Sequence, residues 1–122
     1  MNRRDLENRL VDFAVLIIKI SELLPKTRAG NTLSNQIVRS GTSPALNYGE
    51  AQSAESKKDF VHKLKIILKE LRETFICLKI IKKAKLLEEN DILEYTMHEN
   101  DELIAIFVSS LKTVQQQPSN MK

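Results

Sequence analysis

Cysteine, tryptophan, glycine and proline are scarce in this chain, which has one Cys, no Trp, three Gly and three Pro among 122 residues. A single thiol, Cys77, cannot form an internal disulfide, and its apolar neighbours indicate a small core residue rather than a nucleophile. Aromatic residues make up only 5% of the chain, whereas Leu, Ile, Lys and Glu dominate. Because strands favour aromatic and β-branched residues, this composition favours helix.

Long hydrophobic runs are also missing. The apolar stretch at residues 13–18 is as long as any in the chain and is far too short to span a bilayer. The N-terminal segment opens with Arg3 and Arg4 but then carries Asp5 and Glu7, so it lacks the uncharged apolar centre of a signal peptide. We therefore expect a protein that is neither secreted nor membrane-inserted, and a cytoplasmic location, which the lone cysteine also favours.

No motif for catalysis or cofactor binding is evident. A di-iron bundle needs Glu-x-x-His on two helices, but the nearest match is a single Asp59-x-x-His62, and Glu94 and His98 are four residues apart. The three glycines lack the spacing of a phosphate-binding loop. We therefore predict no enzymatic activity, no metal site and no cofactor.

A hydrophobic pattern with helical spacing runs through the chain. The length of the chain is typical of a single domain. Apolar residues recur at steps of four and three, which predicts four helices, at about residues 3–24, 31–54, 56–84 and 89–115. Residues 116–122 are expected to form a flexible tail. Short connections make neighbouring helices antiparallel, so the sequence predicts an all-α, antiparallel up-down-up-down four-helix bundle over residues 1–115.

The helix ends and the core follow from the same pattern. Pro25 should end the first helix, and the N-caps that we expect are Asn31 or Thr32 and Ser56. Gly41 and Pro44 cost about 1 and about 3 kcal/mol in a helix relative to Ala, so whether the second helix kinks or breaks stays open. The residues expected to face inward are Leu6, Leu10, Phe13, Ile17, Ile20, Leu24, Leu33, Ile37, Gly41, Ala45, Tyr48, Phe60, Leu64, Ile67, Leu71, Thr74, Leu78, Ile81, Leu93, Met97, Asn100, Ile104, Phe107, Leu111 and Val114.

The second predicted helix carries a polar line beside its apolar line. Its members recur at steps of four and three and are Gln36, Ser40, Ser43, Asn47 and Glu50. Two interpretations stay open: the line faces water, or it is buried at a contact between helices or subunits. Burial would require hydrogen-bond partners, above all for Arg39 and Glu50. The candidate partners are Asp59, Lys63 and Glu70.

The third predicted helix carries most of the positive charge. Residues 56–85 hold ten Lys or Arg against three acids, a local charge of +7, whereas residues 86–122 hold two against seven, a local charge of −5. One face carries what we call the basic line, namely Lys58, His62, Lys65, Lys69, Arg72, Lys79 and Lys83. At helical rise it would be about 38 Å long, enough to follow several phosphates.

Two interpretations of the basic line stay open as well. Charged outer faces are commonly just solvated, and acids of the last helix could neutralise part of the line. These acids are Glu88, Glu94, Glu99 and Asp101. Alternatively the line binds nucleic acid, with contacts mainly to phosphates and largely independent of sequence, because no base-reading motif is present.

Five runs of sequence carry a family resemblance: Leu24–Thr27, Gln36–Ser43, Asn47–Ala51, Ala54–Leu64 and Lys69–Thr74. They resemble the signature of the bacterial 23S rRNA intervening-sequence proteins, over about residues 6–110. That family is similar to the accessory variability determinant of diversity-generating retroelements, a pentameric bundle that binds nucleic acid and a reverse transcriptase. The resemblance implies a ring-like homopentamer with a continuous second helix, and an rRNA connection. Pro44 departs from the family pattern, in which a small or aliphatic residue is commoner.

Two functions are consistent with these features. The leading hypothesis is a homo-oligomeric, non-enzymatic accessory protein that binds RNA or DNA phosphates through Lys58, Lys65, Lys69, Arg72, Lys79 and Lys83. The alternative is a protein–protein scaffold ring with no nucleic-acid role, in which the basic line only keeps the ring soluble. Salt dependence separates them, because salt weakens phosphate binding steeply.

Overall fold

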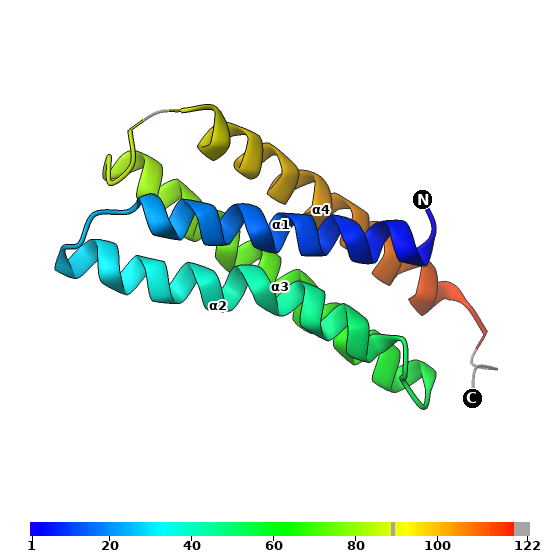
Figure 1. Ribbon diagram of the computed structural model, residues 1–122. Helices are drawn as coiled ribbons and strands as arrows, with labels where there is room; N and C mark the ends of the chain where they lie inside the picture. The colour runs from blue at the N-terminus through cyan, green and yellow to red at the C-terminus, as the bar shows by residue number, and fades with distance from the viewer. Residues whose placement is uncertain (89, 119–122) are drawn as a thin grey trace.

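Four α-helices form the described part of the chain. The computed structural model describes residues 1–88 and 90–118. The helices are α1 (Arg3–Leu23), α2 (Arg28–Ala51), α3 (Lys57–Lys83) and α4 (Asp91–Gln116), and none of the described residues lies in a strand. Successive helices run antiparallel, and α4 also contacts α1, which closes the bundle (Figure 1). The predicted all-α, up-down-up-down four-helix bundle is confirmed.

The start of α2 differs from the prediction. Residues 28–30 are helical rather than loop, and the N-cap is Thr27, whose side chain accepts a hydrogen bond of 3.1 Å from the backbone N–H of Gly30. The expectation that Asn31 or Thr32 caps this helix was therefore wrong. The reason is a close approach that only glycine allows, since a Cβ atom on Gly30 would lie 1.9 Å from the carbonyl oxygen of Pro25.

The other helix ends lie closer to the predicted positions. The capping role of Ser56 is confirmed, because its hydroxyl accepts a 3.1 Å bond from the N–H of Asp59. The second helix ends at Ala51, three residues earlier than expected. The last helix begins after its N-cap, Asn90, and extends to Gln116. Of the predicted tail, residues 119–122 lie outside the described residues.

Helix α2 runs through Pro44 without a break. Proline lacks the N–H that would bond the carbonyl four residues back, and such a position normally kinks or ends a helix. Two side chains near it donate to backbone carbonyls of the same helix: the Thr42 hydroxyl to Val38 at 2.7 Å and the Asn47 amide to Ser43 at 3.0 Å. The continuity that the family resemblance implied is confirmed.

The mid-helix glycine Gly41 is explained by the contact between α1 and α2. A Cβ atom there would lie 2.7 Å from each of two side-chain carbons of Ile17, which is itself fully buried. Real Cβ atoms do not approach this closely, so a larger residue would force the helices apart. The helix-propensity cost of Gly41 is thus offset by close packing against α1.

The core lies between the four helices and is filled largely as predicted on α1 and α3, whereas Leu33 and Ala45 of α2 are only partly buried. Every residue expected to face inward from α1 is buried, and so is every one from α3 except Phe60, which is partly buried. On α4, Met97, Ile104, Leu111 and Val114 are only partly buried. The buried positions of α4 are Leu93, Thr96, Asn100, Leu103 and Phe107. Leu93, Asn100 and Phe107 were predicted correctly, whereas Thr96 and Leu103 were not predicted.

Candidate nucleic-acid interface

Helix α3 has two opposite faces. Its inward face holds Ile67, Leu71 and Leu78, none of which has any exposed surface. All seven members of the basic line are exposed on the outer face, because steps of four and three keep residues on one side of a helix. The structure thus brings the predicted contact residues to one surface, and they are Lys58, Lys65, Lys69, Arg72, Lys79 and Lys83.

Ion pairs occupy the two edges of α3 without involving the basic line. On the edge toward α2, Arg39 donates to Glu70 at 3.2 Å and also pairs with Glu73. On the edge toward α4, Lys82 lies 2.9 Å from a carboxylate oxygen of Glu94. Within residues 1–88 and 90–118, no member of the basic line forms an ion pair. Its charge is therefore available to an anionic ligand.

The acids considered as neutralising partners of the basic line are engaged or lie elsewhere. Glu94 pairs with Lys82, and Glu99 pairs with Arg9 of α1 at 2.7 Å. Glu88 and Asp101 are exposed, and neither pairs with the basic line in the described structure. If this face is only solvated, water and ions rather than these carboxylates balance its charge.

Two details shape the surface along the basic line. At one end, Lys57, Lys58, Val61, His62 and Lys65 surround a shallow hollow of about 390 Å³, in which three ammonium groups and an imidazole flank a single valine. Near the other end, the ammonium of Lys79 lies 5.5 Å from the centre of the Phe75 ring, a cation–π contact. Positive charge therefore continues over both ends of α3.

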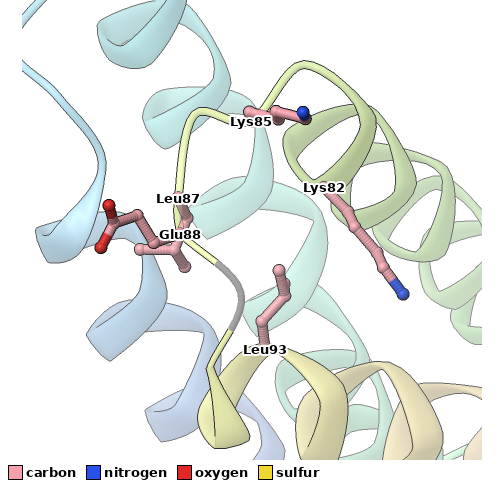
Figure 2. Close-up of a pocket in the computed structure, with 5 residues that line it drawn as sticks. All are labelled: Lys82, Lys85, Leu87, Glu88 and Leu93. Atoms are coloured by element: carbon pink, nitrogen blue, oxygen red, sulfur yellow. The ribbon is translucent and has the colours of Figure 1, made fainter.

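A larger hollow of about 660 Å³ lies beyond the C-terminal end of α3. It is lined by Lys82, Lys85, Leu87, Glu88 and Leu93 (Figure 2). In Figure 2 the ammonium groups of Lys82 and Lys85 point in different directions, and the carboxylate of Glu88 points away from both. Small-molecule sites need polar groups that converge on one point, so this hollow is a poor candidate for one.

The polar line of α2 is partly buried against α3. The hydroxyl of Thr74 lies 2.8 Å from that of Ser40, and both residues are fully buried. The side chain of Gln36 donates to Glu73, which also pairs with Arg39. The interpretation in which this line is buried at a helix contact is therefore correct for Ser40.

The C-terminal half of the polar line behaves differently. Glu50 accepts from the ammonium of Lys63, one of the candidate partners, at 2.6 Å, and this hydrogen bond raises the pKa of Lys63. Asn47 donates to the carbonyl and the hydroxyl of Ser43 on its own helix, at 3.0 and 2.9 Å. Arg39 forms no ion pair with Asp59 in the described part of the chain. A role of this half at a subunit contact stays a prediction.

Some residues of this surface were not predicted. Glu73 joins Gln36 and Arg39 into one group, which depends on how α2 and α3 are rotated relative to each other. Ile76 and Ile80 are exposed beside the basic line, although isoleucine is usually buried. The signal for Ile76 was present in the sequence, because the step of seven from Arg72 to Lys79 skips that position.

Other chemistry is sparse in the described residues. Among residues 1–88 and 90–118, no group of three or more His, Cys, Asp or Glu side chains could hold a metal ion. Cys77 is buried, and desolvation, followed by the nearby charge of Glu73, raises the pKa of its thiol. No helix of the described structure is long and apolar enough to cross a membrane.

Comparisons with known proteins decide the family. The family model described as "23S rRNA-intervening sequence protein" matches residues 5–109. This chain belongs to the 23S rRNA-intervening sequence protein family. A solved structure from Bacteroides thetaiotaomicron, described as a protein of unknown function from the S23 ribosomal protein family, is 30% identical with a TM-score of 0.82. The match covers 92% of this chain and 99% of that one. No curated protein matches this sequence.

Proposed function

We propose that this member of the 23S rRNA-intervening sequence protein family is a homo-oligomeric, non-enzymatic accessory module that binds RNA or DNA in the cytoplasm. The phosphates contact the basic line of α3. The observation that carries the proposal is that six Lys and Arg side chains share one exposed face and form no ion pair among the described residues. Such a face provides affinity for the nucleic-acid backbone without sequence readout.

Assembly into a ring, taken as a pentamer, multiplies the effect of one helix. Several weak phosphate-binding surfaces held in one particle raise the effective concentration of each for the same strand. The resemblance seen in the sequence, which implies a pentamer like the accessory variability determinant, supports the ring. A further support is the outer face of α1, where Val11, Val15 and Ile18 are exposed at steps of four and three. A second copy packed there would bury this apolar surface.

Fluorescence anisotropy with labelled RNA and single-stranded DNA tests the nucleic-acid proposal. The informative variant is Lys65→Glu/Arg72→Glu/Lys79→Glu, because all three side chains are exposed and lie along one face of α3. We expect wild type to bind at low salt, to weaken steeply at moderate salt, and to lose binding in this variant.

The matched control reverses three exposed lysines on other parts of the bundle, Lys19→Glu/Lys26→Glu/Lys112→Glu. It changes the net charge by the same amount, so binding that survives in the control and fails in the α3 variant localises the surface. Circular dichroism and light scattering confirm that both variants stay folded and keep their mass. Absence of wild-type binding at low salt would contradict the proposal and favour the protein scaffold ring.

Light scattering of the purified protein tests the ring separately. We expect a mass of five chains, and Val15→Glu should reduce it while leaving the helical signal unchanged, because Val15 is exposed in the single chain. A monomer at high protein concentration would contradict assembly without bearing on phosphate binding by one chain.

A further inference from the structure

The one gap in the cationic sequence of the basic line is filled by an exposed hydrophobic residue. Elsewhere the basic line recurs at steps of four or three residues, but from Arg72 to Lys79 it advances by seven. Ile76 occupies the position between them where a further basic residue would fall. Ile76 is 52% exposed, and Ile80, one turn further on, is 45% exposed. These are not isolated surface residues, because Arg72, Lys79 and Lys83 lie within one or two turns of them on the same face.

The neighbouring aromatic ring adds to this apolar surface. Phe75 is partly buried at the edge of the face, and the ammonium of Lys79 covers its ring at 5.5 Å from the centre. A phosphate that takes up Lys79 would draw the ammonium off the ring and expose part of it. The face thus pairs three cations with two aliphatic side chains and one aromatic ring.

We propose that this segment of α3, residues 72–83, binds unpaired nucleotides, so that the preferred ligand is single-stranded nucleic acid rather than a duplex. This inference rests on the proposed function. A duplex presents its phosphates to an outer helix face but keeps its base planes stacked inside. A single strand presents phosphates together with base faces, and such faces pack against apolar and aromatic side chains with little regard to sequence. Charge complementarity with the three cations selects this ligand over an uncharged apolar partner.

The test compares one labelled oligonucleotide as a single strand and annealed to its complement. Ile76→Ser/Ile80→Ser removes the exposed aliphatic surface while keeping every charge, and serine and isoleucine have similar helix propensities. We expect this variant to weaken single-strand binding about tenfold and duplex binding less than about twofold, which is the size of a lost base contact. The matched control is Leu46→Ser/Val108→Ser, which removes two exposed aliphatic residues from α2 and α4 and should leave both affinities unchanged.

A second variant gives a readout that does not depend on loss of function. Ile76→Trp introduces the only tryptophan into a chain without any. We expect its fluorescence to be quenched by the single strand, through stacking on a base, and to change little with the duplex. Its affinity for the single strand should rise.

The possible outcomes separate the single-strand inference from the proposed function. Equal or tighter wild-type binding to the duplex, or equal weakening of both ligands by Ile76→Ser/Ile80→Ser, would overturn the single-strand inference and leave phosphate binding intact. No wild-type binding to either ligand would overturn both. A fall in mass of the Ile76→Ser/Ile80→Ser variant would show that a second copy covers these residues, and would also overturn the inference.

Discussion

The hydroxyl oxygens of Ser40 and Thr74 lie 2.8 Å apart in the interface between α2 and α3, and neither residue has exposed surface. The Thr74 hydroxyl is also 2.8 Å from the carbonyl oxygen of Glu70, whereas that of Ser40 lies 3.5 Å from the carbonyl of Ile37. The pair is therefore asymmetric: Thr74 has a second good partner, and Ser40 has only a long one.

This asymmetry predicts unequal effects on stability. Thr74→Val should cost about 1–3 kcal/mol in the free energy of unfolding, because it leaves the buried Ser40 hydroxyl nearly unsatisfied. Ser40→Ala should cost less, about 1 kcal/mol, because Thr74 can still donate to Glu70. Urea unfolding followed by circular dichroism measures both. The double variant should cost less than the sum, and equal costs of the two single variants would be inconsistent with this pairing.

Two glycines of α2 should respond oppositely to alanine. Gly41→Ala should destabilise by about 1–3 kcal/mol, because the new methyl group overlaps Ile17, and this exceeds the propensity gain. Gly49→Ala should stabilise by up to about 1 kcal/mol, because nothing lies within 4 Å of the added atom and alanine favours helix. Thermal unfolding compares the two, and stabilisation by both would refute the close contact between α1 and α2.

Arg9 connects α1 to α4 through ion pairs. Its guanidinium donates to both carboxylate oxygens of Glu99, at 2.7 and 2.8 Å, and to Glu102 at 2.8 Å, and these interactions raise the pKa of Arg9. Glu99→Gln should cost about 1.5–3 kcal/mol because its side chain is only 14% exposed. The control Glu102→Gln, whose side chain is 51% exposed, should cost under about 1 kcal/mol. Urea unfolding that ranks them the other way would contradict this geometry.

The thiol of Cys77 should react slowly with alkylating reagents. Burial raises its pKa above the ordinary 9.0, so the thiolate is scarce at neutral pH and the sulfur is covered. Because the folded state holds this proton more tightly than the unfolded state does, the associated stabilisation is complete below the ordinary pKa. It is lost as pH rises through the folded-state pKa.

A variant with its cysteine at an exposed neighbouring position provides the comparison for the reactivity of Cys77. Ile76→Cys/Cys77→Ala moves the sulfur by one residue to an exposed position of the same helix. Its alkylation rate should be much higher than that of wild type at the same pH, and both rates should rise with pH. Equal rates in native buffer would show that Cys77 is accessible.

The sequence predicts the cores of α1 and α3 well because each has one narrow buried face with strict steps of four and three. It misplaces part of the face of α4, where Asn100 is buried as predicted, but Thr96, which hydropathy marks as polar, and Leu103 are fully buried without having been predicted. It also misplaces the cap of α2, since the approach of Gly30 to Pro25 is a contact between segments that local capping preferences do not include.

For the candidate site, the sequence predicts which basic side chains are exposed, but it predicts only some of the ion pairs between acidic and basic side chains. Helical spacing is sufficient to place Lys65 and Arg72 on one outer face. Which acid reaches which base depends on the rotation and offset of neighbouring helices, so the pairing of Arg39 with Glu70 was anticipated and that with Glu73 was not. The absence of ion pairs along the basic line, within the described residues, follows from the same packing.

Phosphate binding by the basic line is tested most directly by the salt dependence of the affinity for single-stranded nucleic acid. The logarithm of the binding constant should fall linearly with the logarithm of salt concentration, by about 0.7 for each phosphate contacted. Lys65→Glu/Arg72→Glu/Lys79→Glu should make this slope shallower by about 2, whereas Lys19→Glu/Lys26→Glu/Lys112→Glu should leave it unchanged. A flat slope for wild type, or the same change in both variants, would contradict the account.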